Sequence, residues 1–252
     1  MSSIRQCSTK SLADLTREWD QLAEERHRQI ASGEDISFHH VVVPTVRRLL
    51  EGSDTSVILD IGSGTGDFTI LLAQNAGTVI AIEPSMSSMA IARKTGNATP
   101  NVRYAEASLE GAINLPGVES ATAAVAVMTL MTVPDLKGFA AALERVLHKH
   151  ARFIAVLTHP CFWPRYWGYH SESWFHYDRE TFIEAPFVIS KCRSDFITTH
   201  IHRPLELYIN TFAERGFRLD TLVEPMPGTD VEALYSKPWE FPRFLGLRWQ
   251  KV

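Results

Sequence analysis

The chain has 252 residues, of which 45% are hydrophobic and 21% are charged, and its formal net charge is −4. This composition is enough for a sizeable core, and the lack of any run of Lys or Arg argues against a nucleic-acid groove. Three well-separated cysteines, Cys7, Cys161 and Cys192, exclude a disulfide framework and a zinc knuckle and indicate free thiols. No segment approaches the roughly 18 to 20 apolar residues of a membrane span. We therefore expect a cytoplasmic protein without a membrane partner.

Strand and helix signals alternate along the first two thirds of the chain. In chain order, the pattern predicts helices over 12–30 and 41–50, a strand over 57–60, a helix over 68–74, a strand over 79–83, a helix over 85–94 that Ser85 caps, strands over 102–105 and 121–128, a helix over 135–148 and a strand over 152–158. Short apolar strands separated by helices are typical of a parallel sheet covered on both faces. We therefore predict a doubly wound, Rossmann-like α/β fold.

The alternation ends after residue 158. Residues 159–202 form an aromatic, turn-rich segment, which we expect to cover the sheet as a cap insertion. Regular elements return as a helix over 205–215 and strands over 217–223 and 244–250. We expect a single domain over 1–252, with N-terminal helices in 1–55, a cofactor-binding half in 56–158, the cap in 159–202, and a C-terminal helix and strands in 203–252.

The most informative stretch joins the first predicted strand to the helix after it. Asp60 ends the strand, and Gly62, Gly64 and Gly66 follow at alternate positions. This pattern is typical of a turn over a nucleotide-like cofactor, because glycine allows positive φ and close approach of the backbone. In a dinucleotide-binding loop the third glycine comes one residue later, and the carboxylates of Asp60 and Asp67 would repel a pyrophosphate. They would instead attract the sulfonium and ammonium groups of S-adenosylmethionine.

Glu83 ends the second predicted strand, about 20 residues after the glycines. An acid at this place can accept hydrogen bonds from both hydroxyls of a ribose. Because NAD-binding proteins share this feature, Glu83 does not by itself decide between the two cofactors.

Four segments carry motifs in a fixed order: 59–66 (LDIGSGTG), 81–86 (AIEPSM), 104–107 (YAEA) and 128–135 (MTLMTVPD). They resemble the motifs of class I S-adenosylmethionine-dependent methyltransferases, in particular the small-molecule, UbiE/methyltransferase-11-like subgroup. The resemblance implies S-adenosylmethionine as the cofactor and a seven-stranded, mostly parallel sheet with an antiparallel C-terminal strand. It also implies a set of cofactor-binding residues: Asp60, Gly62, Ser63, Gly64, Gly66, Glu83, Pro84, Ser85, Met86, Ala107 and Met128.

The chain departs from this family pattern at three places. Thr122 stands where the fourth strand often begins with an aspartate, and Met131 and Thr132 stand where many relatives have a histidine. Because that histidine takes part in catalysis in some relatives, a base at that position is not available here. The segment 147–150 (LHKH) replaces the usual Lys-Pro-Gly turn, and we interpret its histidines as cations at a helix C-terminus.

Histidines of the cap segment are the candidate bases. His159 follows the fifth strand, and ligands of open α/β sheets lie beyond the carboxyl ends of the strands. His200 and His202 alternate on a predicted strand, and an imidazole can remove a proton near neutral pH. Since no third ligand accompanies this pair, we expect no metal. We predict His159 and His202 as catalytic residues.

Aromatic residues crowd the start of the cap. Trp163, Trp167 and Trp174, together with Trp19 of the N-terminal helix, are predicted to bind a flat acceptor by stacking. The alternative is that the rings of the cap simply pack it onto the sheet. The sequence alone leaves both readings open.

Together these features predict S-adenosylmethionine-dependent methyl transfer to an O, N or C atom of a small aromatic or heteroaromatic metabolite. Proximity and alignment would drive the reaction, with a histidine base where the nucleophile carries a proton. We expect a small-molecule acceptor, no nucleic-acid partner, and a monomer or homodimer. Two alternatives stay open: an NAD-dependent oxidoreductase and a non-catalytic S-adenosylmethionine-binding protein.

Overall fold

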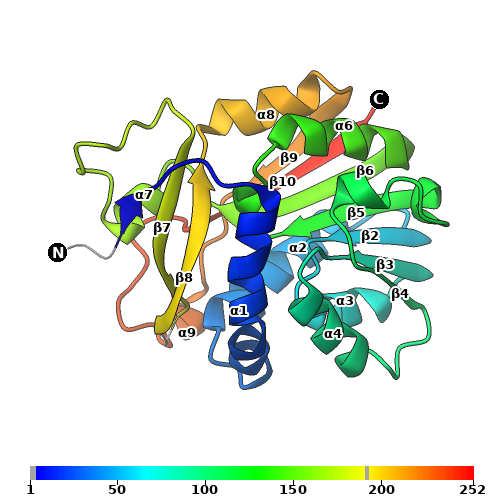
Figure 1. Ribbon diagram of the computed structural model, residues 1–252, viewed down its shortest axis with the longest axis horizontal. Helices are drawn as coiled ribbons and strands as arrows, with labels where there is room; N and C mark the ends of the chain where they lie inside the picture. The colour runs from blue at the N-terminus through cyan, green and yellow to red at the C-terminus, as the bar shows by residue number, and fades with distance from the viewer. Residues whose placement is uncertain (1–3, 191–192) are drawn as a thin grey trace.

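A seven-stranded sheet forms the centre of the protein. The structure, a computed structural model, describes residues 4–190 and 193–252, so Cys192 lies outside the described residues. The strands of this sheet are β2 (Val57–Ile61), β3 (Thr78–Ile82), β4 (Val102–Ala105), β5 (Ala121–Val127), β6 (Leu147–Thr158), β9 (Phe217–Val223) and β10 (Phe244–Lys251). Their order is β4-β3-β2-β5-β6-β10-β9 (Figure 1). β10 runs antiparallel to both neighbours, whereas the pairings among β2 to β6 are parallel. The predicted fold class is confirmed.

Helices cover both faces of this sheet. The described helices are α1 (Leu12–Ala31), α2 (Val43–Leu50), α3 (Asp67–Ala73), α4 (Met86–Thr95), α5 (Leu109–Ala112), α6 (Leu136–Val146), α7 (Trp163–Trp167), α8 (Leu205–Ala213) and α9 (Thr229–Glu232), with a π-helix at Phe38–Val42 and 3₁₀ turns at Val118–Ser120 and Leu130–Thr132. Alternate residues of each strand face opposite layers. In β6, Phe153 and Ala155 pack in the core with α6 and α8, and Ile154 and Val156 pack in the core with α2 and α3. Burial on both faces explains the continuous apolar runs of the strands.

Capping side chains fix the beginnings of two helices around the sheet. Ser85 caps α4, as predicted, and Asp135 caps α6, each by accepting the backbone N–H three residues on, at 3.1 and 2.9 Å. α6 ends earlier than predicted, because residues 147–150 already belong to β6. The interpretation of His148 and His150 as cations at a helix C-terminus was therefore wrong.

The cap contains a second sheet, of which the sequence pattern predicted only the strand that carries His200 and His202. β7 (Thr181–Val188) and β8 (Arg193–His202) pair as an antiparallel hairpin, and the short strand β1 (Arg5–Gln6) pairs with β7. Burial along β7 does not alternate, and Pro186 lies inside the strand, where it argues against strand structure. Both features hide the period of two that reveals a strand in a sequence.

Helix α1 lies between the two sheets, beside α4 and β8 (Figure 1). A capping box between Ser11 and Asp14 fixes its beginning. Its inner face meets the carboxyl ends of the central strands, where it forms one wall of the site described below. Within residues 4–190 and 193–252, neither α1 nor another helix combines the length and the apolar character that crossing a bilayer requires.

Candidate active site

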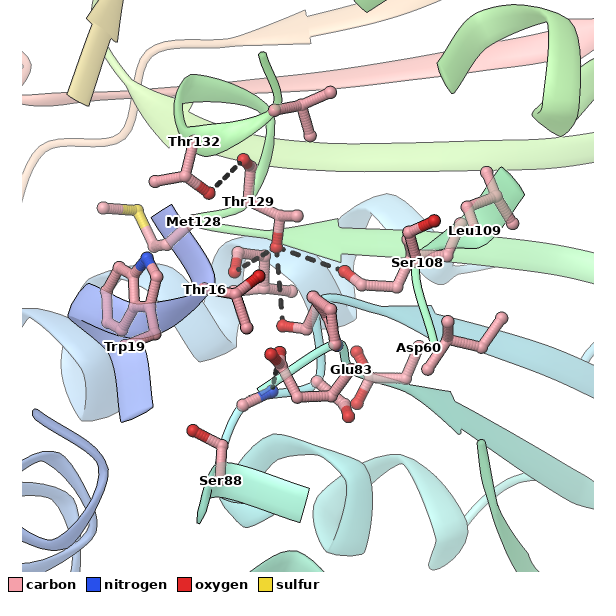
Figure 2. A pocket seen from close by; sticks show the side chains of 18 of the residues that line it. Thr16, Trp19, Asp60, Glu83, Ser88, Ser108, Leu109, Met128, Thr129 and Thr132 are labelled. Carbon is pink, nitrogen blue, oxygen red and sulfur yellow. Dashed lines mark hydrogen bonds between the residues drawn. The ribbon is translucent and has the colours of Figure 1, made fainter. Parts of the chain in front are cut away.

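A cavity of about 410 Å³ opens at the carboxyl ends of β2, β3 and β5. Its walls come from the glycine turn after β2, the segments that follow β3 and β4, the loop after β5 and the inner face of α1 (Figure 2). Ligands of open α/β sheets bind at this edge, and the volume lies within the range of small-molecule sites. The cavity is therefore the candidate active site.

The glycine turn leaves room for a ligand at one of its three glycines. All three have positive φ: +69° at Gly62, +54° at Gly64 and +80° at Gly66. A Cβ on Gly62 would lie 2.5 Å from the side chain of Thr129, and one on Gly66 would lie 2.9 Å from the Cβ of Ala92. Packing within the protein therefore requires these two glycines. A Cβ on Gly64 would meet no atom within 4 Å, so its bare backbone opens onto the cavity.

Asp60 lies at the end of β2, only 1% exposed although it lines the cavity. Its Oδ2 accepts a hydrogen bond from Thr69 Oγ1 at 2.7 Å. Burial raises the pKa of Asp60 to about 6, an effect that the Thr69 hydrogen bond partly offsets. Within the described residues no Lys, Arg or His lies within ion-pair distance of this carboxylate. A cationic ligand would stabilise its ionised form.

Glu83 follows β3 and spans from the glycine turn to the beginning of α4. Its Oε2 accepts the N–H of Gly64 at 3.0 Å, and its Oε1 accepts the N–H of Ser85 at 2.7 Å. Burial raises the pKa of Glu83 to about 7; the two amide hydrogen bonds lower it, and the charges of Asp60 and Asp20 raise it. Each carboxylate oxygen keeps a second lone pair. The fixed carboxylate can thus accept hydrogen bonds from two hydroxyls of a ligand.

The loop after β5 forms a further wall. Met128, which lines the cavity, has a φ of +56°, a conformation that a residue with a Cβ rarely adopts. Its N–H donates to the carbonyl oxygen of Val156 at 2.7 Å. Thr129 Oγ1 donates to the carbonyl oxygen of Ile61, and Thr132 Oγ1 to that of Thr129 (Figure 2). Backbone strain of this kind gathers at functional sites and persists only where the surroundings hold it.

Helix α1 closes the cavity on the side of the cap, and Figure 2 shows the Trp19 ring beside Met128. Asp20, the next residue, fastens the helix to the beginning of α4. Its Oδ1 accepts a hydrogen bond from Ser85 Oγ at 2.7 Å and from the N–H of Ser87 at 3.0 Å. These two hydrogen bonds hold α1, and with it Trp19, against the beginning of α4.

Arg26 of α1 also lines the cavity, and among the described residues it is the only Lys, Arg or His of the lining. Its Nη1 donates to Asp35 Oδ2 at 2.7 Å. Its guanidinium lies 5.8 and 5.6 Å from the ring centroids of Phe38 and Phe187. A guanidinium has five N–H donors, so Arg26 can also bind an anionic group at this end of the cavity.

Most of the predicted cofactor-binding residues are brought together in the lining: Asp60, Gly62, Ser63, Gly64, Glu83, Pro84, Ala107 and Met128. Three others lie outside it. Gly66 is packed against α4, Ser85 is buried as the cap of that helix, and Met86 is 65% exposed. These three shape the walls around the cavity or face solvent.

The predicted catalytic histidines lie outside the lining, and both are hydrogen-bonded within the protein. His159 Nδ1 accepts the N–H of Cys161 at 3.2 Å, so the ring's other nitrogen carries the proton and donates to Glu224 at 2.9 Å. His202 Nε2 donates to the carbonyl oxygen of Tyr177 at 2.9 Å. Burial lowers the pKa of both imidazoles. The structure does not bring either ring to the cavity.

Of the four tryptophans predicted to bind the acceptor, Trp19 lines the cavity and the others do not. Trp163 is 9% exposed, and its ring lies 5.3 Å from that of Trp167. The ring of Trp174 stacks on that of Tyr169 with centroids 5.8 Å apart. This arrangement matches the packing alternative for the aromatic segment.

Sequence reasoning missed Thr16, Arg26, Phe38 and Thr129 as lining residues. Three of them come from the N-terminal helices, and only Trp19 pointed to that part of the chain. In the part of the chain that the structure describes, no three His, Cys, Asp or Glu side chains are placed to hold a metal ion.

Comparisons with known proteins agree with this geometry. Residues 59–155, from β2 into β6, match the family model described as a methyltransferase domain. No curated protein matches the chain.

Several solved structures share the fold. An S-adenosylmethionine-dependent methyltransferase from Thermotoga maritima, described as a possible histamine N-methyltransferase, is 20% identical over 94% of this chain and 100% of its own, with a TM-score of 0.64. One from Mesorhizobium loti is 20% identical over 82% of this chain and 96% of its own, with a TM-score of 0.61. The 1,6-didemethyltoxoflavin-N1-methyltransferase of Burkholderia thailandensis is 12% identical over 99% of this chain and 95% of its own, with a TM-score of 0.62. Residues 59–155 are therefore similar to a methyltransferase domain, and the chain shares the fold of these S-adenosylmethionine-dependent methyltransferases.

Proposed function

We propose that the protein transfers a methyl group from S-adenosylmethionine to a nitrogen of a small, aromatic or heteroaromatic acceptor. The observation that carries this proposal is the pair of buried carboxylates, Asp60 and Glu83, that line one cavity together with the open backbone of Gly64. A dinucleotide would place its pyrophosphate beside these charges. An adenosyl ligand with a cationic end fits them.

The residues of the cavity fit S-adenosylmethionine group by group. Glu83 would accept hydrogen bonds from the ribose hydroxyls, and Asp60 would stabilise the positive charge of the methionyl end. Arg26 would bind the carboxylate of that end with the N–H donors that Asp35 does not use. When bound, S-adenosylmethionine supplies an electrophilic methyl group on a sulfonium.

Histidine, the most frequent general base, is absent from the described lining of the cavity. Among the described residues, the lining contains no His, Lys, Cys or Tyr. Its carboxylates other than Glu110 already accept hydrogen bonds within the protein: Asp60 from Thr69, Asp67 from Thr65, Glu83 from Gly64 and Ser85, and Asp135 from Gly138. A nucleophile that already presents a lone pair, such as an amine or a ring nitrogen, needs no base. Alignment of donor and acceptor can then supply most of the rate enhancement.

The acceptor side of the cavity is apolar and close to α1. Trp19, Met128 and Val133 line it, and the surplus of carboxylates over Arg26 favours a neutral or cationic acceptor over an anionic one. The neighbour from Burkholderia thailandensis, which by its name methylates N1 of 1,6-didemethyltoxoflavin, supports this choice of acceptor class. We treat residues 1–252 as one functional domain, in which the cap holds α1 in place.

An acceptor screen tests this proposal. The protein is incubated at pH 7.5 with methyl-labelled S-adenosylmethionine and with matched pairs of acceptors, each an aryl or heteroaryl amine and the phenol of the same skeleton. We expect label to enter amines and ring nitrogens and not the paired phenols. Transfer to phenols alone would contradict the choice of nitrogen. Binding of S-adenosylhomocysteine without turnover on any pair would favour the non-catalytic alternative, and binding of NADH in its place would favour the oxidoreductase.

A further inference from the structure

Arg203 is a buried charge at the junction between the two sheets. It follows β8 directly and precedes α8, and its side chain has no solvent-exposed surface. An arginine is almost never fully buried without partners. The partners of this guanidinium therefore indicate what it does.

The guanidinium of Arg203 donates in two directions. On one side, Nε donates to Glu180 Oε2 at 2.5 Å, just before β7. On the other, Nη1 donates to the carbonyl oxygen of Leu130 at 3.1 Å, and Nη2 donates to those of Val133 at 2.7 Å and Pro134 at 3.3 Å. One planar group thus joins the cap hairpin to three carbonyl groups of the loop after β5.

This loop is the wall of the cavity that carries Met128. Val133 and Pro134 line the cavity, while their carbonyl oxygens accept from Arg203 behind it. A loop with a single 3₁₀ turn cannot satisfy all of its own carbonyl groups, and buried carbonyls need a donor. The positive φ of Met128 also needs surroundings that hold it.

We propose that Arg203, oriented by Glu180, positions the loop after β5 and thereby sets the shape of the cofactor and acceptor cavity. The inference deepens the proposed function and rests on it for the identity of the ligand. Arg203 is a positioning residue, because it touches the wall of the cavity and not its interior. Lysine cannot replace it, since a single ammonium cannot present parallel donors to separated carbonyl groups.

The test compares Arg203→Lys with a second buried arginine. Arg243 is 8% exposed, contacts the rings of Tyr166 and Trp239 and has no hydrogen bond to the loop. Both variants, Arg203→Lys and Arg243→Lys, keep the charge and lose the planar fork. The measurements are the thermal midpoint, the affinity for S-adenosylhomocysteine by calorimetry, and hydrogen exchange of the amides of Met128 and Thr132.

We expect Arg203→Lys to speed hydrogen exchange of both amides and to weaken S-adenosylhomocysteine binding. The affinity should fall by about tenfold or more, because the loss of one hydrogen bond to a charged group has an effect of this size. Arg243→Lys should lower the thermal midpoint and leave both readouts unchanged. Glu180→Gln, which keeps Arg203 in place, should show the same changes as Arg203→Lys to a smaller extent, and it decides the matter if Arg203→Lys does not fold.

Equal behaviour of the two arginine variants, with a lower thermal midpoint and unchanged affinity and exchange, would overturn the positioning role. Failure of the wild-type protein to bind S-adenosylhomocysteine would instead contradict the proposed function. In that case the exchange of Met128 and Thr132 amides still decides whether Arg203 holds the loop.

Discussion

The cavity and the aromatic cap both bury ionisable side chains, but they differ in what those side chains contact. In the cavity, Asp60 and Glu83 are hydrogen-bonded only by neutral groups. In the cap, His159 donates to Glu224 and His202 to a carbonyl oxygen. Burial and aromatic density are therefore poor signs of a ligand site, whereas a buried charge without a counter-charge is a good one. Variants of the cap should therefore change stability, and variants of the cavity should change ligand binding.

Removal of a cap tryptophan should have the largest effect, and that effect should fall on stability. Trp163→Ala empties a buried site and should lower the free energy of unfolding by about 3–5 kcal/mol. Affinity for S-adenosylhomocysteine, measured well below the thermal midpoint, should stay nearly unchanged. Chemical denaturation and calorimetry give the two quantities. Trp19→Ala is the control, because its ring lines the cavity. Equal loss of affinity in the two variants would mean that the cap also forms the binding site.

Glu83→Gln should have the next largest effect, and it should fall on affinity. The carboxamide keeps one acceptor oxygen but loses the charge and the second acceptor, so S-adenosylhomocysteine binding should weaken by about tenfold to a hundredfold. Calorimetry measures the change. Glu106→Ala is the matched control, since Glu106 is exposed and lies outside the lining. Comparable effects of the two variants would show that Glu83 makes no specific contact.

The strands and the glycine turn could be predicted because their signals are local. The apolar run from Val57 to Asp60 indicates a strand that is buried on both faces of the sheet. The glycines indicate the positive φ values that the turn requires. Of the β7–β8 hairpin, only the strand that carries His200 and His202 was predicted, because Pro186 and irregular burial hide the strand period of β7.

Contacts that depend on the whole fold could not be predicted from the sequence either. Arg26 reaches the cavity only because α1 crosses the edge of the sheet, and Arg203 meets the loop after β5 only through the packing of the cap. His159 was placed correctly after β6, but no local pattern showed that its ring is held by Glu224, far along the chain. Local sequence patterns therefore place a residue on its element but do not determine where its side chain points.

The pH dependence of stability should show a smaller effect. Burial raises the pKa of Asp60 to about 6 and that of Glu83 to about 7, above their ordinary values of 3.8 and 4.5. The folded protein then binds more protons than the unfolded chain between about pH 4 and 7, so these groups make the ligand-free protein less stable as pH rises through this window. Asp60→Asn should reduce this loss. Denaturation at pH 5 and pH 8 measures it, and an unchanged pH difference in the variant would contradict the raised pKa.

The cap histidines should show the smallest effect. His202→Asn keeps a donor for the carbonyl oxygen of Tyr177, and His159→Gln keeps one for Glu224, so neither should change the rate of methyl transfer by more than about threefold. The rate is measured with the acceptor that the screen identifies. A fall of two orders of magnitude in either variant would restore that histidine as a catalytic base.

We propose that the unpaired carboxylates of the cavity receive an adenosyl ligand with a cationic end. Calorimetric titration of S-adenosylhomocysteine at pH 6.5, in two buffers of different ionisation enthalpy, tests it most directly, because the buffer dependence counts the protons exchanged. Ionised Asp60 and Glu83 bind this ligand best, and their raised pKa values leave them partly protonated at that pH. The account predicts binding with net release of protons, which Glu83→Gln reduces. Absence of binding, or binding with uptake of protons, would contradict it.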